Sequence, residues 1–136
     1  MGARTEPAEM FGCDICFPDD IELAGKCWYK VPVIKALIAE SHFSIKVRQC
    51  NSCGQRFVTV FAEMIDWQTG EDPQQCCALP ITELEAARLL KAGSDAEAES
   101  IAESLGANRR SFSSFWPSGK GKSDVWSTGF LIGMHD

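Results

Sequence analysis

Alternating hydrophobic and polar residues in the middle of the chain predict two neighbouring strands. Phe43, Ile45 and Val47 alternate with polar residues, which is the period of a strand with one buried face. Residues 56–66 carry apolar side chains at positions of both parities, as in a central strand that is covered on both faces. Residues 49–55, which contain a pair of cysteines, connect these two segments.

Three further segments have the pattern of amphipathic helices. In residues 31–41, Pro32 fits the first turn and four apolar residues form one stripe, so we expect a helix there. Residues 82–91 and 94–106 each begin with Ser or Thr followed three positions later by Glu, the capping box, and each stops at a glycine. The stripe consists of Val33, Ile34, Leu37 and Ile38, and the caps and stops are Thr82, Glu85, Gly93, Ser94, Glu97 and Gly106.

Two short apolar runs near the end of the chain predict additional strands. The runs at residues 125–126 and 130–132 are bounded by Gly129 and Gly133. Short apolar segments between glycines are typical of hairpins and edge strands. We therefore expect this part of the chain to extend the sheet.

The composition is that of a globular domain with its own core. The chain has 136 residues, of which 45% are hydrophobic and 24% charged. It contains no run of about 18 apolar residues, the length that a membrane span requires, and residues 1–12 lack the apolar core of a signal peptide. We therefore expect a cytoplasmic protein that has no membrane contact.

The negative charge of the chain lies mainly in its central third. The formal net charge is −6, and residues 67–105 contain eight Asp or Glu residues against two Lys or Arg residues. The electrostatic field of this negative charge repels nucleic acid at long range and favours a protein partner with a basic surface. We expect Glu83, Glu97, Glu99 and Glu103 to face that partner, with a merely solvated face as the alternative.

Four of the seven cysteines form two Cys-x-x-Cys pairs. Cys13 and Cys16 form the first pair, and Cys50 and Cys53 form the second pair after 33 intervening residues. Two residues between thiolates let both bind one ion, and two such pairs complete a tetrahedron. A reducing compartment favours metal binding over disulfides. Gly54 suits the turn after the second pair, where positive φ is needed. The sequence therefore predicts a four-cysteine metal site.

The second pair continues as Cys-Gly-x-x-Phe up to Phe57, and with this feature residues 11–67 resemble the zinc-ribbon class. The resemblance implies a structural zinc held by two knuckles, but no particular function. A rubredoxin carries two similar pairs, so iron is the alternative, although the second pair here lacks the proline that rubredoxins place after its first cysteine. We therefore expect an α+β fold made of a zinc-ribbon-type antiparallel sheet, a helix in the insertion, an acidic helical pair and C-terminal strands. Its parts are an arm at residues 1–12, the ribbon at 13–67, and helices and strands at 68–136 in the same domain.

The other three cysteines lie outside these pairs. Cys27 is followed by two aromatic residues and is expected in the core. Cys76 and Cys77 lie between two prolines and are expected in or near a loop, where packing is the first interpretation. Redox activity or binding of a soft metal is the alternative for this adjacent pair.

Residues 97–116 resemble a helix-turn-helix unit. Gly106 falls at the turn, and Asn108 is placed to cap a third helix. Arg109 and Arg110 would then project from the first turn of a recognition helix toward DNA bases. An ordinary helix pair with two solvated arginines is the other interpretation, and the net negative charge favours it.

The sequence contains no motif of the common catalytic classes. Gly-x-Ser-x-Gly, a phosphate-binding loop and His-Glu-x-x-His are all absent. Four cysteine ligands also leave a metal no open position for chemistry. We therefore expect a small non-catalytic zinc-binding protein that acts as a protein-interaction module, such as an adaptor or an immunity protein that neutralises a toxin. A sequence-specific DNA-binding regulator that uses residues 97–116 is the second interpretation, and a thiol redox protein is the third.

Overall fold

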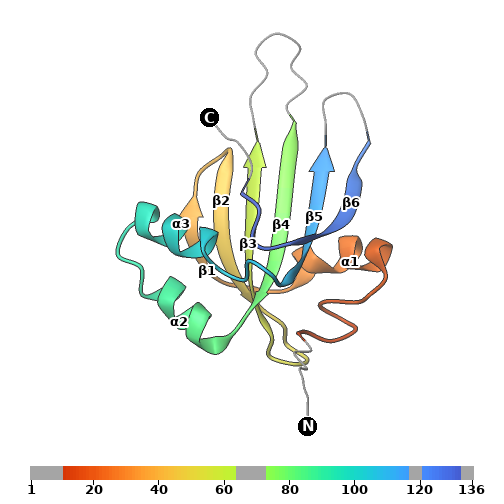
Figure 1. The fold of residues 1–136 in the computed structure, drawn as a ribbon, viewed down its shortest axis with the longest axis horizontal. Coiled ribbons are helices and arrows are strands. Elements are labelled where there is room, and N and C mark those ends of the chain that lie inside the picture. The colour runs from red at the N-terminus through yellow and green to blue at the C-terminus, as the bar shows by residue number, and fades with distance from the viewer. Residues whose placement is uncertain (1–10, 64–72, 117–120, 133–136) are drawn as a thin grey trace.

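The computed structural model describes residues 11–63, 73–116 and 121–132, and its centre is a six-stranded antiparallel sheet (Figure 1). The strands lie side by side in the order of the sequence, so that each pairs with the next one along the chain. The strands are β1 (Val33–Ala39), β2 (Phe43–Gln49), β3 (Arg56–Glu63), β4 (Gln74–Ile81), β5 (Arg110–Trp116) and β6 (Ser123–Thr128).

The register places alternate residues of the central strands on one buried face. Val47 pairs with Val58, and Val58 pairs in turn with Leu79. Two residues further along, Ile45 pairs with Val60 on the same face. These five side chains are almost completely buried, because a strand points every second side chain to the same side. They form the centre of the main hydrophobic core.

Two helices cover this face of the sheet. Helix α2 (Glu83–Leu90) packs over β1 and β3, and helix α3 (Asp95–Glu103) packs over β1 (Figure 1). Ala86, Leu89 and Ala102 are fully buried at this contact. Burying a side chain such as Leu89 stabilises the fold by about 1.5–3 kcal/mol. Both helices were predicted, and their presence beside the sheet confirms an α+β fold.

The predicted capping boxes form completely at α2 and in half at α3. The Thr82 hydroxyl accepts a hydrogen bond from the Glu85 backbone N–H, and the Glu85 carboxylate accepts one from the Thr82 N–H. The Ser94 hydroxyl likewise accepts from the Glu97 N–H at 3.1 Å. The Glu97 carboxylate, however, accepts from the N–H of Gly93, one residue before the cap, at 2.8 Å.

A third helix lies on the opposite face of the sheet. Helix α1 (Ile21–Cys27) continues into the 3-10 turn η2 (Trp28–Lys30) and packs against β5 and β6 (Figure 1). Ala24 of the helix shares a buried cluster with Ala78 and Phe112 of the sheet. The sheet is therefore covered on both faces. None of the described helices combines the length and the apolar character needed to cross a membrane.

The predicted helix at residues 31–41 is wrong, because this segment is strand β1. Lys35 pairs with Val47 and Ile38 with Ile45 of the neighbouring strand. Adjacent β-branched and apolar residues fit a strand as well as a helical stripe, and pairing with β2 decides between them. The helix of the insertion is α1, which begins earlier in the chain, after Asp20. The carboxylate of Asp20 accepts hydrogen bonds from two backbone N–H groups of the first turn.

The predicted recognition helix is also wrong, because residues 110–116 form strand β5. β5 pairs on one side with β4 (Cys77 with Ser113) and on the other with β6 (Ser113 with Val125). Buried pairing on both sides outweighs the weak helical pattern of this segment.

The outcome for the remaining strands is mixed. β2 and β3 are confirmed as a strand pair, with residues 64–66 of the prediction outside the described residues. Cys76 and Cys77 lie in the middle of β4, so the predicted loop is wrong. The tail does extend the sheet through β6, whereas Phe130 leaves the sheet and packs into the core.

Candidate metal centre

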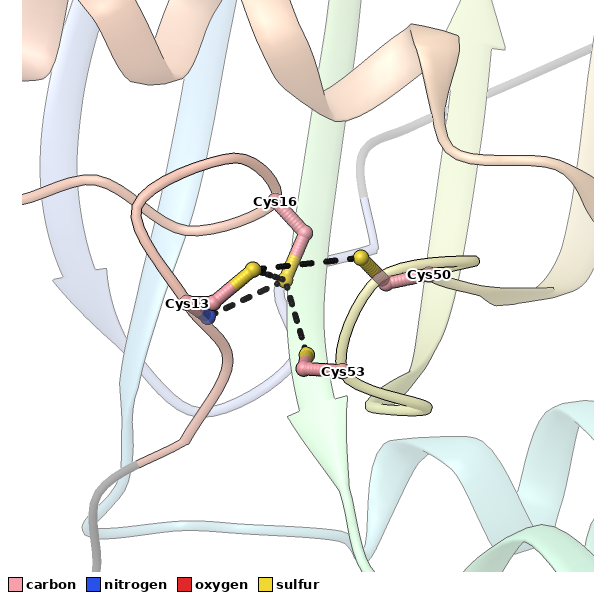
Figure 2. A group of neighbouring side chains, drawn as sticks. All are labelled: Cys13, Cys16, Cys50 and Cys53. Atoms are coloured by element: carbon pink, nitrogen blue, oxygen red, sulfur yellow. Dashed lines mark hydrogen bonds between the residues drawn. The ribbon is translucent and has the colours of Figure 1, made fainter.

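Four cysteine side chains meet at one end of the sheet (Figure 2). Cys13 and Cys16 come from the turn that precedes α1, and Cys50 and Cys53 come from the turn between β2 and β3. All four sulfur atoms lie within 4.8 Å of one another. The structure thus brings together the four cysteines that the sequence had paired.

The spacing of the sulfurs fits one tetrahedral metal ion. The Sγ–Sγ distance is 3.8 Å for Cys13 and Cys16, 3.9 Å for Cys13 and Cys50, and 3.7 Å for Cys16 and Cys53. Four sulfurs bound to zinc at roughly 2.3 Å stand about 3.8 Å apart at the corners of a tetrahedron. All four are free cysteines rather than disulfides. The donor set and its geometry therefore suit a metal that prefers thiolate ligands.

Each pair of cysteines is held by a compact backbone turn. In the first turn, the Phe17 N–H donates to the Cys13 carbonyl at 2.8 Å. In the second, the Gly54 N–H donates to the Cys50 carbonyl at 3.0 Å. Gly54 has a φ of 80°, the left-handed conformation that was predicted for this position. The Ser52 N–H also donates to the Cys50 sulfur at 3.4 Å.

The four cysteines differ in burial, and three of their thiols have shifted pKa values. Cys16 and Cys50 are buried, Cys13 is half-buried, and Cys53 is exposed. The backbone N–H of Cys16 lowers the pKa of the Cys13 thiol to about 7. Burial raises the pKa of Cys16 above its ordinary value, and partial desolvation of the Cys53 sulfur raises the pKa of Cys53 although the residue as a whole is exposed. A metal ion bound here would therefore have to displace protons from Cys16 and Cys53, whereas Cys13 is partly ionised at neutral pH.

Gln55 connects the two cysteine turns to the sheet. Its side-chain oxygen accepts a hydrogen bond from the Gly12 N–H at 3.0 Å, just before the first pair. Its side-chain nitrogen donates to the Ile81 carbonyl at the end of β4 at 2.8 Å. The rings of Phe17 and Phe57 lie 5.7 Å apart and link the same turns through an apolar contact. Gln55 has no signal in the sequence, because its partners Gly12 and Ile81 lie far away in the chain.

Arg109 and Arg110, the predicted DNA contacts, are engaged within the protein. Arg109 forms a bidentate ion pair with Glu85, with N–O distances of 2.7 and 3.2 Å. Arg110 pairs with Asp19 at 3.0 Å, and its guanidinium lies 4.1 Å from the centre of the Trp126 ring. The helix that would have presented these arginines to DNA is replaced by β5.

The predicted acidic surface lies on α2 and α3. Glu83, Glu97 and Glu103 are exposed, and Glu99 is half-buried. None of the four forms an ion pair with another described residue. Glu85 differs from them: burial acts to raise its pKa, but the hydrogen bonds from Arg109 and Thr82 outweigh this effect and hold the pKa below its usual value.

The other cysteines lie apart from the cluster in different environments. Cys76 and Cys77 are neighbours in a strand and therefore point to opposite faces of the sheet. Burial raises the pKa of the Cys76 thiol to about 12 and also raises that of Cys77. Because the two thiols lie on opposite faces of the sheet, they are not placed to react with each other in redox chemistry. Cys27 is half-buried at the end of α1.

Comparisons with known proteins add no relationship to this geometry. A scan against protein-family models finds no match, and neither the curated proteins nor the solved structures include one that matches the chain.

Proposed function

We propose that the protein is a small zinc-binding protein whose metal is structural. The observation that carries this proposal is the meeting of four cysteine sulfurs, all within 4.8 Å, from two turns that are far apart in the sequence. Four protein ligands fill the tetrahedral coordination of zinc, so that no position remains for a substrate or a water molecule. Zinc is preferred over iron because the second pair lacks the proline that is found in rubredoxins.

The zinc would fasten the N-terminal turn to the sheet. Cys16 and Cys50 belong to a small buried cluster with Val31 and Phe57, which is separate from the main core. A cluster of this size contributes little hydrophobic stability by itself. Structural zinc sites contribute on the order of 10 kcal/mol in small domains. We infer that the metal, more than the packing, holds this end of the molecule together.

We propose further that the protein acts as a protein-interaction module. A closed metal site supports a binding role over a catalytic one. With zinc bound by four thiolates, the formal net charge would change from −6 to about −8. A field of this sign speeds association with a basic partner, and the exposed carboxylates of α2 and α3 are the surface predicted to meet it.

The metal assignment is tested by measuring the metal content of the full chain purified under reducing conditions. We expect one zinc per chain, and we expect the substitution Cys50→Ser to remove it. Cys27→Ser is the matched control, because Cys27 is a free thiol outside the cluster, and it should retain the metal. Replacement of zinc by cobalt should give the absorption spectrum of a tetrahedral tetrathiolate. Protein that contains iron, or no metal at all, would contradict the proposal.

A further inference from the structure

The two edges of the sheet are built differently. Strand β1 forms one edge and β6 forms the other, because the strands follow one another in the order of the sequence (Figure 1). The register of β1 with its neighbour shifts at two places, between Val33 and Lys35 and between Ala36 and Ile38. Such irregularities, together with an edge lysine, hinder the addition of another strand. The β1 edge is therefore protected against pairing with another chain.

The β6 edge lacks these protective features. All residues of β6 (Ser123–Thr128) pair with β5 in an unbroken register, and the strand contains neither lysine nor proline. Its one charged residue, Asp124, is already engaged within the sheet. The Asp124 carboxylate accepts a hydrogen bond from the Ser114 hydroxyl at 2.8 Å and lies 3.4 Å from the Lys122 ammonium. A regular edge without a free charge or a proline is open to a further strand.

The outer backbone groups of β6 are unpaired. The Gly129 N–H donates to the Arg109 carbonyl at 2.8 Å, and these two residues extend the β5–β6 register by one position. Because hydrogen-bonded pairs alternate along an antiparallel ladder, Asp124, Trp126 and Thr128 direct their backbone N–H and C=O groups away from β5. Within the described part of the chain, no hydrogen bond uses these outward groups. They match the backbone of an extended chain laid alongside.

The side chains along β6 add an apolar contact to this edge. Val125 is 38% exposed. It lies on the face of the main core, because it pairs with Ser113, which pairs in turn with the core residue Cys77. A residue of an added strand that lies opposite Val125 would cover it. An apolar or β-branched residue is therefore favoured at that position of the added strand.

The charge of the chain favours a different protein over a second copy at this edge. Two copies would each carry a net charge of −6, or about −8 with the proposed zinc, and would repel each other. A segment with basic residues is attracted by the same field. The complement of the β6 edge is therefore an extended basic segment with an apolar residue in its pairing part.

We propose that β6 is a docking strand, along which an extended basic segment of a partner protein adds as a further strand of the sheet. This assignment rests on the proposed interaction function and specifies its contact surface. The outward backbone groups of Asp124, Trp126 and Thr128 supply the hydrogen bonds, and Val125 supplies the apolar contact. The acidic helices α2 and α3 pack over β1 and β3, away from this edge, and attract the partner at long range.

The test uses a display library of short random peptides selected on the immobilised, zinc-loaded full chain. We expect the enriched peptides to carry Lys or Arg and β-branched residues, and to lack proline in the pairing part. Thr128→Pro should weaken their binding at least about tenfold, because it removes one outward N–H and places a ring at the edge. Thr128→Val is the matched control, because it keeps the N–H, and should leave the affinity within about twofold.

Two measurements show whether the peptide pairs through its backbone. In hydrogen exchange followed by NMR, a bound peptide should slow the exchange of the Asp124, Trp126 and Thr128 amides at least about tenfold, and change that of Ser127, which bonds to β5, much less. N-methylation of every second peptide bond of the ligand should abolish binding in one phase and be tolerated in the other. Both measurements use the wild-type chain, so they do not depend on the folding of Thr128→Pro.

Three results would overturn the assignment, and they leave the proposed function separately testable. Peptides that bind Thr128→Pro as well as wild type, without protecting the outward amides, would place the contact elsewhere; their loss of binding to Glu97→Lys would move it to α3. A dimer of the full chain that Thr128→Pro dissociates would assign the edge to a second copy. Failure to enrich any peptide would overturn β6 as a docking strand, whereas the metal content and the capture of a protein partner by the wild-type chain would still test the zinc and interaction roles.

Discussion

The ion pair between Glu85 and Arg109 should stabilise the fold by an amount that Arg109→Met can measure. Arg109 donates to both carboxylate oxygens of Glu85 and also to the Pro80 carbonyl at 2.9 Å. The pair joins α2 to the segment that leads into β5. Arg109 therefore has a structural role in place of the predicted contact with DNA. The contribution of this role to stability can be predicted quantitatively.

The expected loss of stability follows from the burial of the two side chains. Their burial is intermediate between that of fully buried ion pairs and that of exposed ion pairs. The side chains of Arg109 and Glu85 are 18% and 19% exposed. Breaking a fully buried pair costs about 3–5 kcal/mol, and an exposed pair is worth about 0.2–1 kcal/mol. We expect Arg109→Met to lower the free energy of unfolding by about 2–3 kcal/mol. Glu85→Gln, which keeps an acceptor for the Thr82 N–H, should lower it by about 1–2 kcal/mol.

The assay is urea unfolding of zinc-loaded protein at constant free zinc, followed by tryptophan fluorescence. A double-mutant cycle with Glu85→Gln and Arg109→Met should give a coupling energy of about 1–2 kcal/mol. Arg110→Met is the matched control, because Arg110 and its partner Asp19 are 43% and 94% exposed, and it should cost less than about 1 kcal/mol.

The coupling energy should also be independent of pH near neutrality. The folded pKa of Glu85 is lowered, so its contribution is fully present above the unfolded pKa and is lost only as the pH falls through the folded pKa. We therefore expect a constant coupling energy from about pH 8 to about pH 6. A coupling energy near zero, or one that decreases over this range, would refute the structural role of the pair.

Three further predictions follow from the cysteines and the acidic helices. Removal of metal by a strong chelator should lower the unfolding midpoint of the wild type sharply but leave that of metal-free Cys50→Ser unchanged, as compared by circular dichroism. In zinc-loaded protein, a small alkylating reagent should modify Cys27 well before Cys76 and Cys77, which are buried, and mass spectrometry of peptides would show the order. Equal rates for the three thiols would contradict the burial of β4. Changing Glu97 and Glu99 together to Lys should lower the melting temperature modestly, because the hydrogen bond from the Gly93 N–H to Glu97 at the start of α3 is lost, and should slow association with a basic partner, most clearly at low salt. An association rate that did not respond would restrict these carboxylates to a role in solubility.

Features that depend on nearby residues could be predicted from the sequence. The Thr82 capping box, the turn at Gly54 and the alternation in β2 each involve partners within a few positions. Each Cys-x-x-Cys pair can also be recognised from a few adjacent residues. Only the prediction that the two pairs bind the same ion required an assumption. The tetrahedral chemistry of thiolate ligands supplied that assumption.

Features that depend on distant partners could not be predicted in this way. Val33 and Ile34 fit a helical stripe, and only pairing with β2 makes them part of a strand. β5 carries Ser111 and Ser113, which are polar yet fully buried. The sequence of β5 therefore does not show which of its residues are buried. The pairing of Arg109 with Glu85 joins residues 24 positions apart and has no local signal.

The sequential order of the strands has a consequence for how the protein folds. Because each strand pairs with its neighbour in the chain, the β2–β3 hairpin is assembled from local contacts, and we expect it to form early. It already carries Cys50 and Cys53, and so offers an incoming ion two thiolates before the rest of the site exists. The turn with Cys13 and Cys16 must then close a loop of 33 residues, which costs roughly 4 kcal/mol in chain entropy. We therefore expect the hairpin to capture the proposed metal before the N-terminal turn docks, and the rate of capture, not of docking, to rise with the concentration of free zinc.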